Sequence, residues 1–254
     1  AFARYSGKGQ GEVTLFRQLW DLFRPGDVVL TDALMSNYQN LSWLQQRGVD
    51  VVTRLNKSKR TADFRKGRRL GKNDRLVCWK KPWIRDLNRD ERRAIPDSLT
   101  IRQCRFWVDQ PGFRSQEVII ITTMLDPREV SAPELADLYR MRWNNETDFS
   151  SLKVALQMDV LRCKTPELVR KEVWTHALAY NLIRTIMAQS CRRAGKLPRE
   201  ISFKATVQIL KAFQPVIAAW RDRSRAARNL IYDQLIDAIA LHRVGNRPGR
   251  IEPR

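Results

Sequence analysis

The stretch that decides the fold covers residues 28–54 and reads VVLTDALMSNYQNLSWLQQRGVDVVTR. It opens with three apolar residues and ends with VDVVTR (49–54), and short apolar runs of this kind are typical of strands buried on both faces. Between them, residues 38–47 have apolar positions at helical spacing, and Gly48 follows as a helix stop. The stretch therefore predicts a βαβ unit with Asp32 at the carboxyl end of its first strand, where open α/β sheets place their ligands.

The pattern of helices and strands continues on both sides of this unit. Residues 12–22, EVTLFRQLWDL, have the spacing of an amphipathic helix, and residues 117–125, EVIIITTML, have the composition of another buried strand. Residues 56–115 are basic, rich in tryptophan and broken by Gly, Pro and Asn into short alternating runs. Such runs are typical of β-strands and loops, so we interpret this segment as a β-rich insertion.

The remainder of the chain predicts helices. Ser131 and Glu134 have the spacing of a capping box, which opens a helix that includes residues 139–153. Residues 167–189 have a long amphipathic pattern, and residues 201–241 contain at least two more helices. The fold class is therefore α/β, divided into the first part of a core (1–55), a β-rich insertion (56–115), the second part of the core (116–190) and a C-terminal helical region (191–254).

The charge of the chain points to a polyanionic partner. Lys and Arg number 47 against 27 acids, a formal net charge of +20, and such an excess is most often found in nucleic-acid-binding proteins, although ribosomal and membrane-surface proteins share it. Four scattered cysteines and two histidines do not predict a zinc site. Because there is neither a signal peptide nor an apolar run of about 18 residues, we expect a cytoplasmic protein with no membrane partner.

One helical segment carries charged residues in a single line. At about 100° of rotation per residue, Tyr139, Arg142, Glu146 and Lys153 fall within a stripe about 60° wide on residues 139–153, YRMRWNNETDFSSLK. Apolar positions lie beside this stripe, so a carboxylate is expected at the edge of the core between two cations. The alternative for Glu146 is an exposed acid in an i, i+4 ion pair with Arg142.

Asp32 and Glu146 form a candidate pair of metal-binding acids. Mg²⁺ prefers a few carboxylate oxygens together with waters and substrate phosphates. Two such ions about 4 Å apart can hold the attacking and leaving oxygens of a phosphoryl displacement, and that chemistry needs a third acid. The alternative for Asp32 is a turn or N-cap residue after a strand.

The spacing Tyr-x2-Arg-x3-Glu-x6-Lys, matched by Tyr139, Arg142, Glu146 and Lys153, resembles that of the DDE transposases of bacterial insertion sequences, of the insertion-sequence-four kind. The resemblance extends to GDVVLTDALMSNY around Asp32, to LRCKTPELVRKEVWTHALAYNLIRTIM after the helix and to the terminal NRPGRIEPR. It implies an RNase H-like α/β core, interrupted by a mostly β insertion before the last acid and followed by a helical C-terminal part.

The resemblance also implies roles for individual residues. Glu146 is similar to the final catalytic, metal-binding acid of the family, and Asp32 is similar to the second. The resemblance assigns Tyr139, Arg142 and Lys153 to contacts with DNA near the cleaved phosphate, and it implies Mg²⁺ or Mn²⁺ as cofactor, with two ions in the complete enzyme. No residue matches the family's first catalytic Asp, so we expect the chain to be truncated at both ends, or a decayed copy, and inactive alone.

Aromatic and basic residues alternate in the insertion. Trp79, Trp83 and Trp107 stand among lysines and arginines, a mixture that suits stacking on an extruded DNA base. The alternative is that these three side chains form the small core of the insertion. A second basic set either binds DNA or only covers a solvated helix surface, and it consists of Arg192, Arg193, Arg221, Arg223, Arg225 and Arg228.

The function that the resemblance implies is DNA transposition by metal-dependent phosphoryl transfer, in which the ends of an insertion sequence are cut and the freed 3′ hydroxyl is joined to target DNA. The implied partners are double-stranded DNA, of the element ends and of the target, and a second copy of the chain in a synaptic homodimer. The implied location is the bacterial cytoplasm, with the protein on the nucleoid when DNA-bound. The alternative is a catalytically dead, DNA-binding remnant that competes with, or inhibits, an intact copy.

Overall fold

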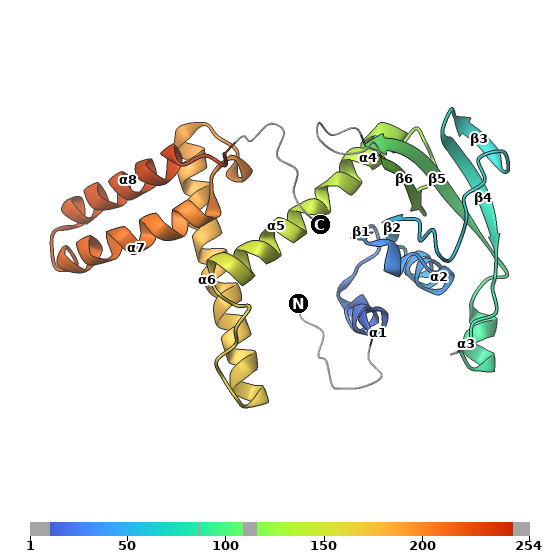
Figure 1. Cartoon of the computed structure of the whole chain (residues 1–254), viewed down its shortest axis with the longest axis horizontal. Helices are drawn as coiled ribbons and strands as arrows, with labels where there is room; N and C mark the ends of the chain where they lie inside the picture. Colours follow the sequence, from blue (N-terminus) through green and yellow to red (C-terminus); the bar gives the residue numbers. More distant parts are fainter. Residues whose placement is uncertain (1–10, 86, 109–115, 246–254) are drawn as a thin grey trace. The chain divides into compact units, whose positions relative to one another are not determined.

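The computed structural model describes residues 11–85, 87–108 and 116–245 (Figure 1). The chain divides into two compact units, and the second begins at Asn144. The predicted boundaries after residues 55, 115 and 190 stay predictions. Among the described helices, none combines the length and the apolar character needed to cross a lipid bilayer.

The first unit is built on a six-stranded sheet (Figure 1). The strand β1 pairs in parallel with β2, and every other pair of neighbours is antiparallel. The mixed α/β architecture predicted from the sequence is confirmed, and it is consistent with an RNase H-like fold. In the order in which they lie across the sheet, the strands are β1 (Val28–Thr31), β2 (Asp50–Arg54), β6 (Gln116–Thr122), β5 (Ser98–Val108), β4 (Asp74–Lys80) and β3 (Arg68–Gly71).

The predicted βαβ unit is confirmed. The helix α2 (Tyr38–Gln46) connects β1 to β2, and the side chain of Asn37 caps it by accepting from the Asn40 N–H. Gly48 follows the helix with φ of 71°, a left-handed conformation that glycine adopts without strain. A Cβ atom at this position would lie 3.2 Å from the Cβ of Pro25. Glycine therefore satisfies both the turn and the close approach of the chain.

The prediction that the first strand is buried on both faces is wrong. Val28 is 39% exposed, and of the residues in β1 only Thr31 is buried. In β2, by contrast, the three central residues Val51, Val52 and Thr53 are all buried. The difference arises because, among the described strands, β1 has a neighbour on one side only.

Strands from residues 56–115 extend the same sheet. The strands β3, β4 and β5 all come from this segment, and the second part of β5 pairs with the whole of β6, from Arg102 opposite Thr122 to Val108 opposite Gln116. The short helix α3 (Arg89–Ala94) stands between β4 and β5 and begins with a capping box. The segment thus has the strands that its alternation predicts, and β5 joins them to the rest of the sheet through its pairing with β6.

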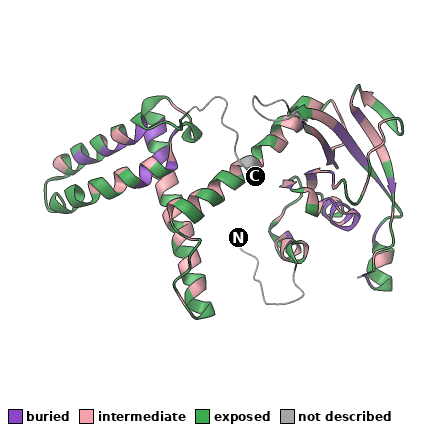
Figure 2. Ribbon diagram, viewed as in Figure 1, coloured by how far each residue is buried: buried purple, intermediate pink, exposed green. Residues whose placement is uncertain are grey.

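Helices cover both faces of the sheet. On one face, Ile119 and Ile121 of β6 pack with Leu41 and Leu44 of α2, together with the short N-terminal helix α1 (Glu12–Arg17) and its 3-10 continuation (Trp20–Leu22). On the other face, Ile120 packs with Leu135 of α4 (Ala132–Met141). Successive residues of a strand point to opposite faces, so β6 contributes to both apolar layers (Figure 2).

The second unit is helical. Its core joins three helices through Met187 and Cys191, Phe203 and Val207, and Leu235 and Ile239. The two predictions of helices, at residues 167–189 and 201–241, are confirmed. The elements of this unit are α5 (Trp143–Ser150), a π-helix (Ser151–Ala155), α6 (Pro166–Ala194), a 3-10 turn (Pro198–Glu200), α7 (Phe203–Ala219) and α8 (Arg225–Leu241).

Candidate active site

Asp32 lies where the sequence places it, directly after β1. Its carboxylate is exposed, and Oδ1 accepts a hydrogen bond of 2.9 Å from the Leu34 N–H, which caps the 3-10 turn Ala33–Met35. Its backbone carbonyl accepts from the Thr53 hydroxyl at 2.6 Å, which joins it to β2. Within the described residues, Oδ2 accepts no hydrogen bond. Asp32 is thus an N-cap, as one interpretation held, and it still presents a carboxylate oxygen to solvent.

Three further side chains gather around the same end of the sheet. Tyr139 of α4 is half-buried against the apolar layer that contains Leu135. Burial raises the pKa of the Tyr139 phenol and the charge of Asp32 adds to the rise, whereas Arg142 and Arg54 act in the opposite direction. The guanidinium of Arg142 also lies 5.7 Å from the centroid of the Tyr139 ring. The structure therefore brings one acid, one phenol and two guanidinium groups together.

Arg54 belongs to this cluster, although sequence analysis did not single it out. It is the last residue of β2, which runs parallel to β1 with Thr31 opposite Thr53. The carboxyl ends of adjacent parallel strands meet at one edge of a sheet. The predicted βαβ unit therefore already contained the signal that would have placed Arg54 beside Asp32.

Glu146 and Lys153 lie in the second unit, and both are exposed. They are not on one uniform α-helix, contrary to the prediction for residues 139–153. The helix α4 ends at Met141, α5 follows, and residues 151–155 are a π-helix in which the Leu156 N–H donates to the Ser151 carbonyl at 3.1 Å. A π-turn contains more residues than an α-turn, so Lys153 is not in the angular position that ideal α-helical spacing assigns to it.

A partly exposed ion network holds the helix that carries Glu146. Asp148, also in α5, accepts a 2.7 Å hydrogen bond from Arg184 of α6 and hydrogen bonds of 2.8 and 2.9 Å from Arg199. Although burial acts to raise the pKa of Asp148, hydrogen bonds from Arg199 and Tyr180 and the guanidinium charges hold this pKa below its usual range. Sequence analysis missed Asp148, because its two partners are far along the chain.

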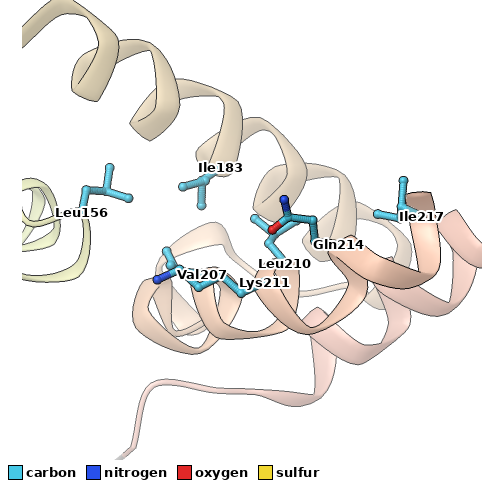
Figure 3. Close-up of a pocket in the computed structure, with 7 residues that line it drawn as sticks. All are labelled: Leu156, Ile183, Val207, Leu210, Lys211, Gln214 and Ile217. Carbon is cyan, nitrogen blue, oxygen red and sulfur yellow. The ribbon is translucent and has the colours of Figure 1, made fainter. Parts of the chain in front are cut away.

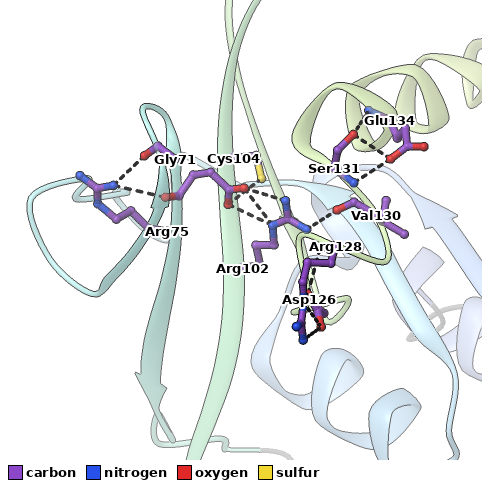
Figure 4. A network of polar contacts seen from close by, with 10 residues as sticks. Gly71, Arg75, Arg102, Cys104, Asp126, Arg128, Val130, Ser131 and Glu134 are labelled. Carbon is purple, nitrogen blue, oxygen red and sulfur yellow. Dashed lines mark hydrogen bonds and ion pairs between the residues drawn. The ribbon is translucent and has the colours of Figure 1, made fainter.

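A second ion pair, which is buried, supports the start of α4. Arg102 of β5 is fully buried and bonds Asp74 of β4 at 2.6 Å, while its Nη1 atom donates to the Val130 carbonyl, also at 2.6 Å (Figure 4). Val130 directly precedes Ser131, whose side chain and that of Glu134 form the predicted capping box, which is confirmed. Arg102 thus links two strands to the helix that positions Tyr139.

The three candidate tryptophans differ in exposure. Trp83 is 80% exposed, and the guanidinium of Arg92 lies 3.6 Å from the centroid of its ring. Trp107, near the end of β5, is 60% exposed. Trp79 is 6% exposed and packs with Leu99 in the core, so it does not offer a ring to a partner, and the packing alternative describes it.

The second unit contains a hollow that is lined mainly by apolar side chains, unlike the exposed surroundings of Asp32 and Glu146. It has a volume of about 380 Å³ and lies along α6 and α7 (Figure 3). Its only charged side chain is Lys211, so it offers no carboxylate to a cation. It is lined by Leu156, Ile183, Val207, Leu210, Lys211, Gln214 and Ile217.

The donor chemistry of the two candidate acids fits a hard divalent cation, which prefers exposed carboxylate oxygens. Asp32 and Glu146 are both exposed, and Asp32 has a carboxylate oxygen that accepts no hydrogen bond within the described residues. Among those same residues, no group of three or more His, Cys, Asp or Glu side chains is arranged to hold a metal ion. The described geometry therefore supplies individual ligands and no assembled three-acid site.

Comparison with known proteins adds an independent observation. The family model described as the transposase DDE domain matches residues 4–182, more than half of the chain. A stretch of 151 residues, 56% of this chain, is 30% identical to the transposase InsG for insertion sequence element IS4 of Escherichia coli (strain K12) and covers 31% of that protein. A stretch of 72 residues, 28% of this chain, is 40% identical to the transposase for insertion sequence element IS421 of Escherichia coli and covers 19% of it. The matches thus span less than a third of either relative's length.

Proposed function

Because this chain belongs to the family of DDE transposases, we propose that it takes part in cutting and joining DNA at the ends of an insertion sequence. The observation that supports this proposal is the cluster at the carboxyl end of β1 and β2. There, the exposed carboxylate of Asp32 acts electrostatically on the Tyr139 phenol together with Arg54 and Arg142. An acid surrounded by phosphate-binding side chains suits a nucleic acid whose phosphate is to be displaced.

Each of the site residues has a role in this proposal. Asp32 and Glu146 are the ligands of a divalent ion, Mg²⁺ or Mn²⁺, which when bound lowers the pKa of the attacking group and stabilises charge on the phosphate. Arg142 and Lys153 bind phosphate oxygens of the DNA near the cleaved phosphate through charge-assisted hydrogen bonds. Tyr139, whose raised pKa keeps the phenol protonated, donates a hydrogen bond to the DNA backbone.

The proposed reaction proceeds in two displacements without a covalent protein intermediate. A water oxygen first attacks the phosphorus at the element end and gives up a proton to solvent, while the bond from phosphorus to the 3′ oxygen breaks and this oxygen takes up a proton from solvent. The freed 3′ hydroxyl then loses its proton to solvent as its oxygen attacks a phosphodiester of the target DNA, and the original bond to the target 3′ oxygen breaks as that oxygen takes up a proton. The DNA partners and a synaptic homodimer are parts of this proposal.

A second candidate function is a DNA-binding chain that does not cut. It is favoured by the lack of a three-acid group within the described residues. Adding the chain to an intact relative that cuts its own element ends distinguishes the two. Inhibition that is equally strong for the chain and for its Asp32→Asn variant supports the binder.

Iron-directed cleavage of the polypeptide tests the assignment of the two acids. Fe²⁺ occupies oxygen-ligand sites in place of Mg²⁺, and with ascorbate and peroxide it produces radicals that cut the backbone near the bound ion. We expect cuts near Asp32 and near Glu146 that excess Mg²⁺ suppresses. The Asp32→Asn and Glu146→Gln variants should lose them, whereas Asp27→Asn, at an exposed acid just before β1, should keep them.

Cuts that persist unchanged in both variants would overturn the metal-ligand roles. In a complete transposase that contains this chain, Glu146→Gln should abolish strand cleavage of element-end DNA while DNA binding remains. Retained cleavage in that variant contradicts the proposed role of Glu146.

A further inference from the structure

The turn between α7 and α8 carries a concentration of arginines. It lies beyond residues 4–182, the part that matches the family model, so the family match assigns it no role. Four arginines stand within eight residues, and the single acid among them is Asp222. The local formal charge is therefore +3, four arginines minus one acid, on residues 221–228. These arginines are Arg221, Arg223, Arg225 and Arg228.

Three of these arginines form no ion pair within the second unit as the structure describes it. All four are exposed, and within the described residues Arg221, Arg223 and Arg225 make no ion pair. Three other arginines of this unit do form ion pairs: Arg184 and Arg199 with Asp148, and Arg193 with Asp233 and Asp237. An exposed charge without an internal partner adds little to stability, so the cluster is available to an external anion.

The backbone of the turn is ordered by its own hydrogen bonds. The Trp220 N–H donates to the carbonyl of Val216 at 3.1 Å at the end of α7, and Ser224 caps α8 by accepting from the Ala227 N–H at 3.3 Å. The guanidinium of Arg228 donates to the carbonyl of Arg221 at 3.3 Å, which ties the first helical turn of α8 to the loop. The arginines therefore project from a defined structure.

The chemistry of the turn suits phosphate. A guanidinium group binds two phosphate oxygens in a planar fork, and the N-terminus of α8 adds a partial positive charge at the same place. A bilayer surface requires instead a broad apolar face with a basic rim. The exposed apolar side chains beside the turn are Val216, Ile217, Trp220 and Leu230, at 38%, 45%, 36% and 54% exposed, and binding to phospholipid vesicles tests whether they serve a bilayer.

We propose that the α7–α8 turn is a contact site for the phosphate backbone of duplex DNA, distinct from the acids of the proposed catalytic site. The choice of DNA as the polyanion rests on the proposed function. The contact requires no metal ion and no particular base sequence, because it is made to phosphate groups. It gives the second unit its own affinity for DNA.

The salt dependence of binding tests this site. A labelled duplex of about 25 base pairs and random sequence is titrated with the chain in EDTA between about 50 and 200 mM KCl. Removing three phosphate contacts in the variant Arg221→Gln/Arg223→Gln/Arg225→Gln should lower the slope of log K against log salt by about 2 to 3, and should weaken binding roughly 10- to 100-fold.

A matched variant controls for net charge. Lys164→Gln/Arg170→Gln/Lys204→Gln removes the same three charges from exposed positions away from the turn, just before α6, on α6 and on α7. For this variant, the slope of log K against log salt should differ from that of the unaltered chain by no more than about 1, the change that one phosphate contact produces. Equal losses in both triple variants would mean that only net charge matters, and the proposal would be overturned.

Two further readouts separate this inference from the proposed function. The turn variant should keep the iron-directed cuts near Asp32 and Glu146, so a failure of this inference and a failure of the metal-ligand roles give different results. Anionic phospholipid vesicles serve as the alternative partner. If the turn variant loses binding to vesicles while its DNA binding is unchanged, the site belongs to a membrane and the proposal is wrong. Thermal unfolding confirms that each variant is folded.

Discussion

The carboxylate of Asp148 accepts two hydrogen bonds from the guanidinium of Arg199, at 2.8 and 2.9 Å. This pair fastens α5, two residues beyond Glu146, to the 3-10 turn that contains Arg199. Replacing Asp148 by Asn removes the charge from the network, and we expect the free energy of unfolding to fall by about 1–2 kcal/mol. Urea unfolding measures this change, and Asp159→Asn, at an exposed acid of the same unit, should change it by less than about 0.5 kcal/mol.

The stability contributed by Asp148 depends on pH. Its pKa is lower in the folded protein than in the unfolded chain, so its contribution is complete above the unfolded value of about 4 and is lost as the pH falls through the folded value. The difference in unfolding free energy between the unaltered chain and Asp148→Asn should therefore shrink as the pH falls from about 6 to about 3. A difference that stays constant over this range would mean that the carboxylate is not in the ion network.

The buried pair of Arg102 and Asp74 makes a larger contribution. In Arg102→Met the Asp74 carboxylate, 8% exposed, loses its partner, and we expect a loss of about 3–5 kcal/mol in unfolding free energy. The control is Arg128→Met, because the Arg128 side chain is 88% exposed in its pair with Asp126. Its loss should stay below about 1 kcal/mol. Similar losses in the two variants would contradict the burial of Arg102.

The ionisation of Tyr139 reports on the position of Asp32. Since the negative charge of Asp32 contributes to raising the pKa of the Tyr139 phenol, Asp32→Asn should lower that pKa, and Arg54→Gln should raise it. The pKa is obtained from ultraviolet titration, as the difference between each variant and the same variant with Tyr139→Phe. If neither substitution changes the pKa of Tyr139, the phenol does not lie near Asp32 and Arg54 at the ends of β1 and β2.

The turn after α2 tests the geometry of the βαβ unit. Gly48 and Gly195 both have positive φ, of 71° and 62°, but a Cβ on Gly48 would lie 3.2 Å from the Pro25 Cβ, whereas a Cβ on Gly195 meets nothing within 4 Å. We expect Gly195→Ala to lower the unfolding free energy by about 1 kcal/mol through backbone strain. Gly48→Ala should exceed this by about a further 1 kcal/mol. If the two substitutions lower the unfolding free energy equally, Pro25 moves away from the added Cβ at no cost, and the predicted close contact is wrong.

Local signals in the sequence predict much of this fold. The helix spacing of residues 38–47, the stop at Gly48 and the capping box at Ser131 involve residues within a few positions of one another, and all three are confirmed. The exposure of β1 is different, because it depends on which strands lie beside it in the sheet. A run such as Val28 to Leu30 is apolar enough for either an edge or a central strand.

The candidate site shows the same limit. The position of Asp32 after a strand follows from the local sequence pattern. The residues that lie near it in space, and the residues that bind Asp148 on the helix of Glu146, do not follow from local pattern. Asp148 is 51 residues from Arg199, so no spacing rule connects them. Among the tryptophans, Trp79 is buried and Trp83 exposed although both stand beside basic residues, because strand position and packing, and not composition, decide which ring reaches solvent.

The π-helix at residues 151–155 changes what the six-residue interval between Glu146 and Lys153 means. A π-turn accommodates one residue more than a turn of the regular helix around it. Converting the number of residues into an angle at the α-helical value therefore overstates the rotation between the two side chains. A homologue that lacks one residue here, and has an ordinary helix instead, would hold its acid and its lysine in a similar relative orientation. Searches for such proteins by a rigid letter pattern would pass over it, whereas a pattern that permits a single-residue gap at this point would find it.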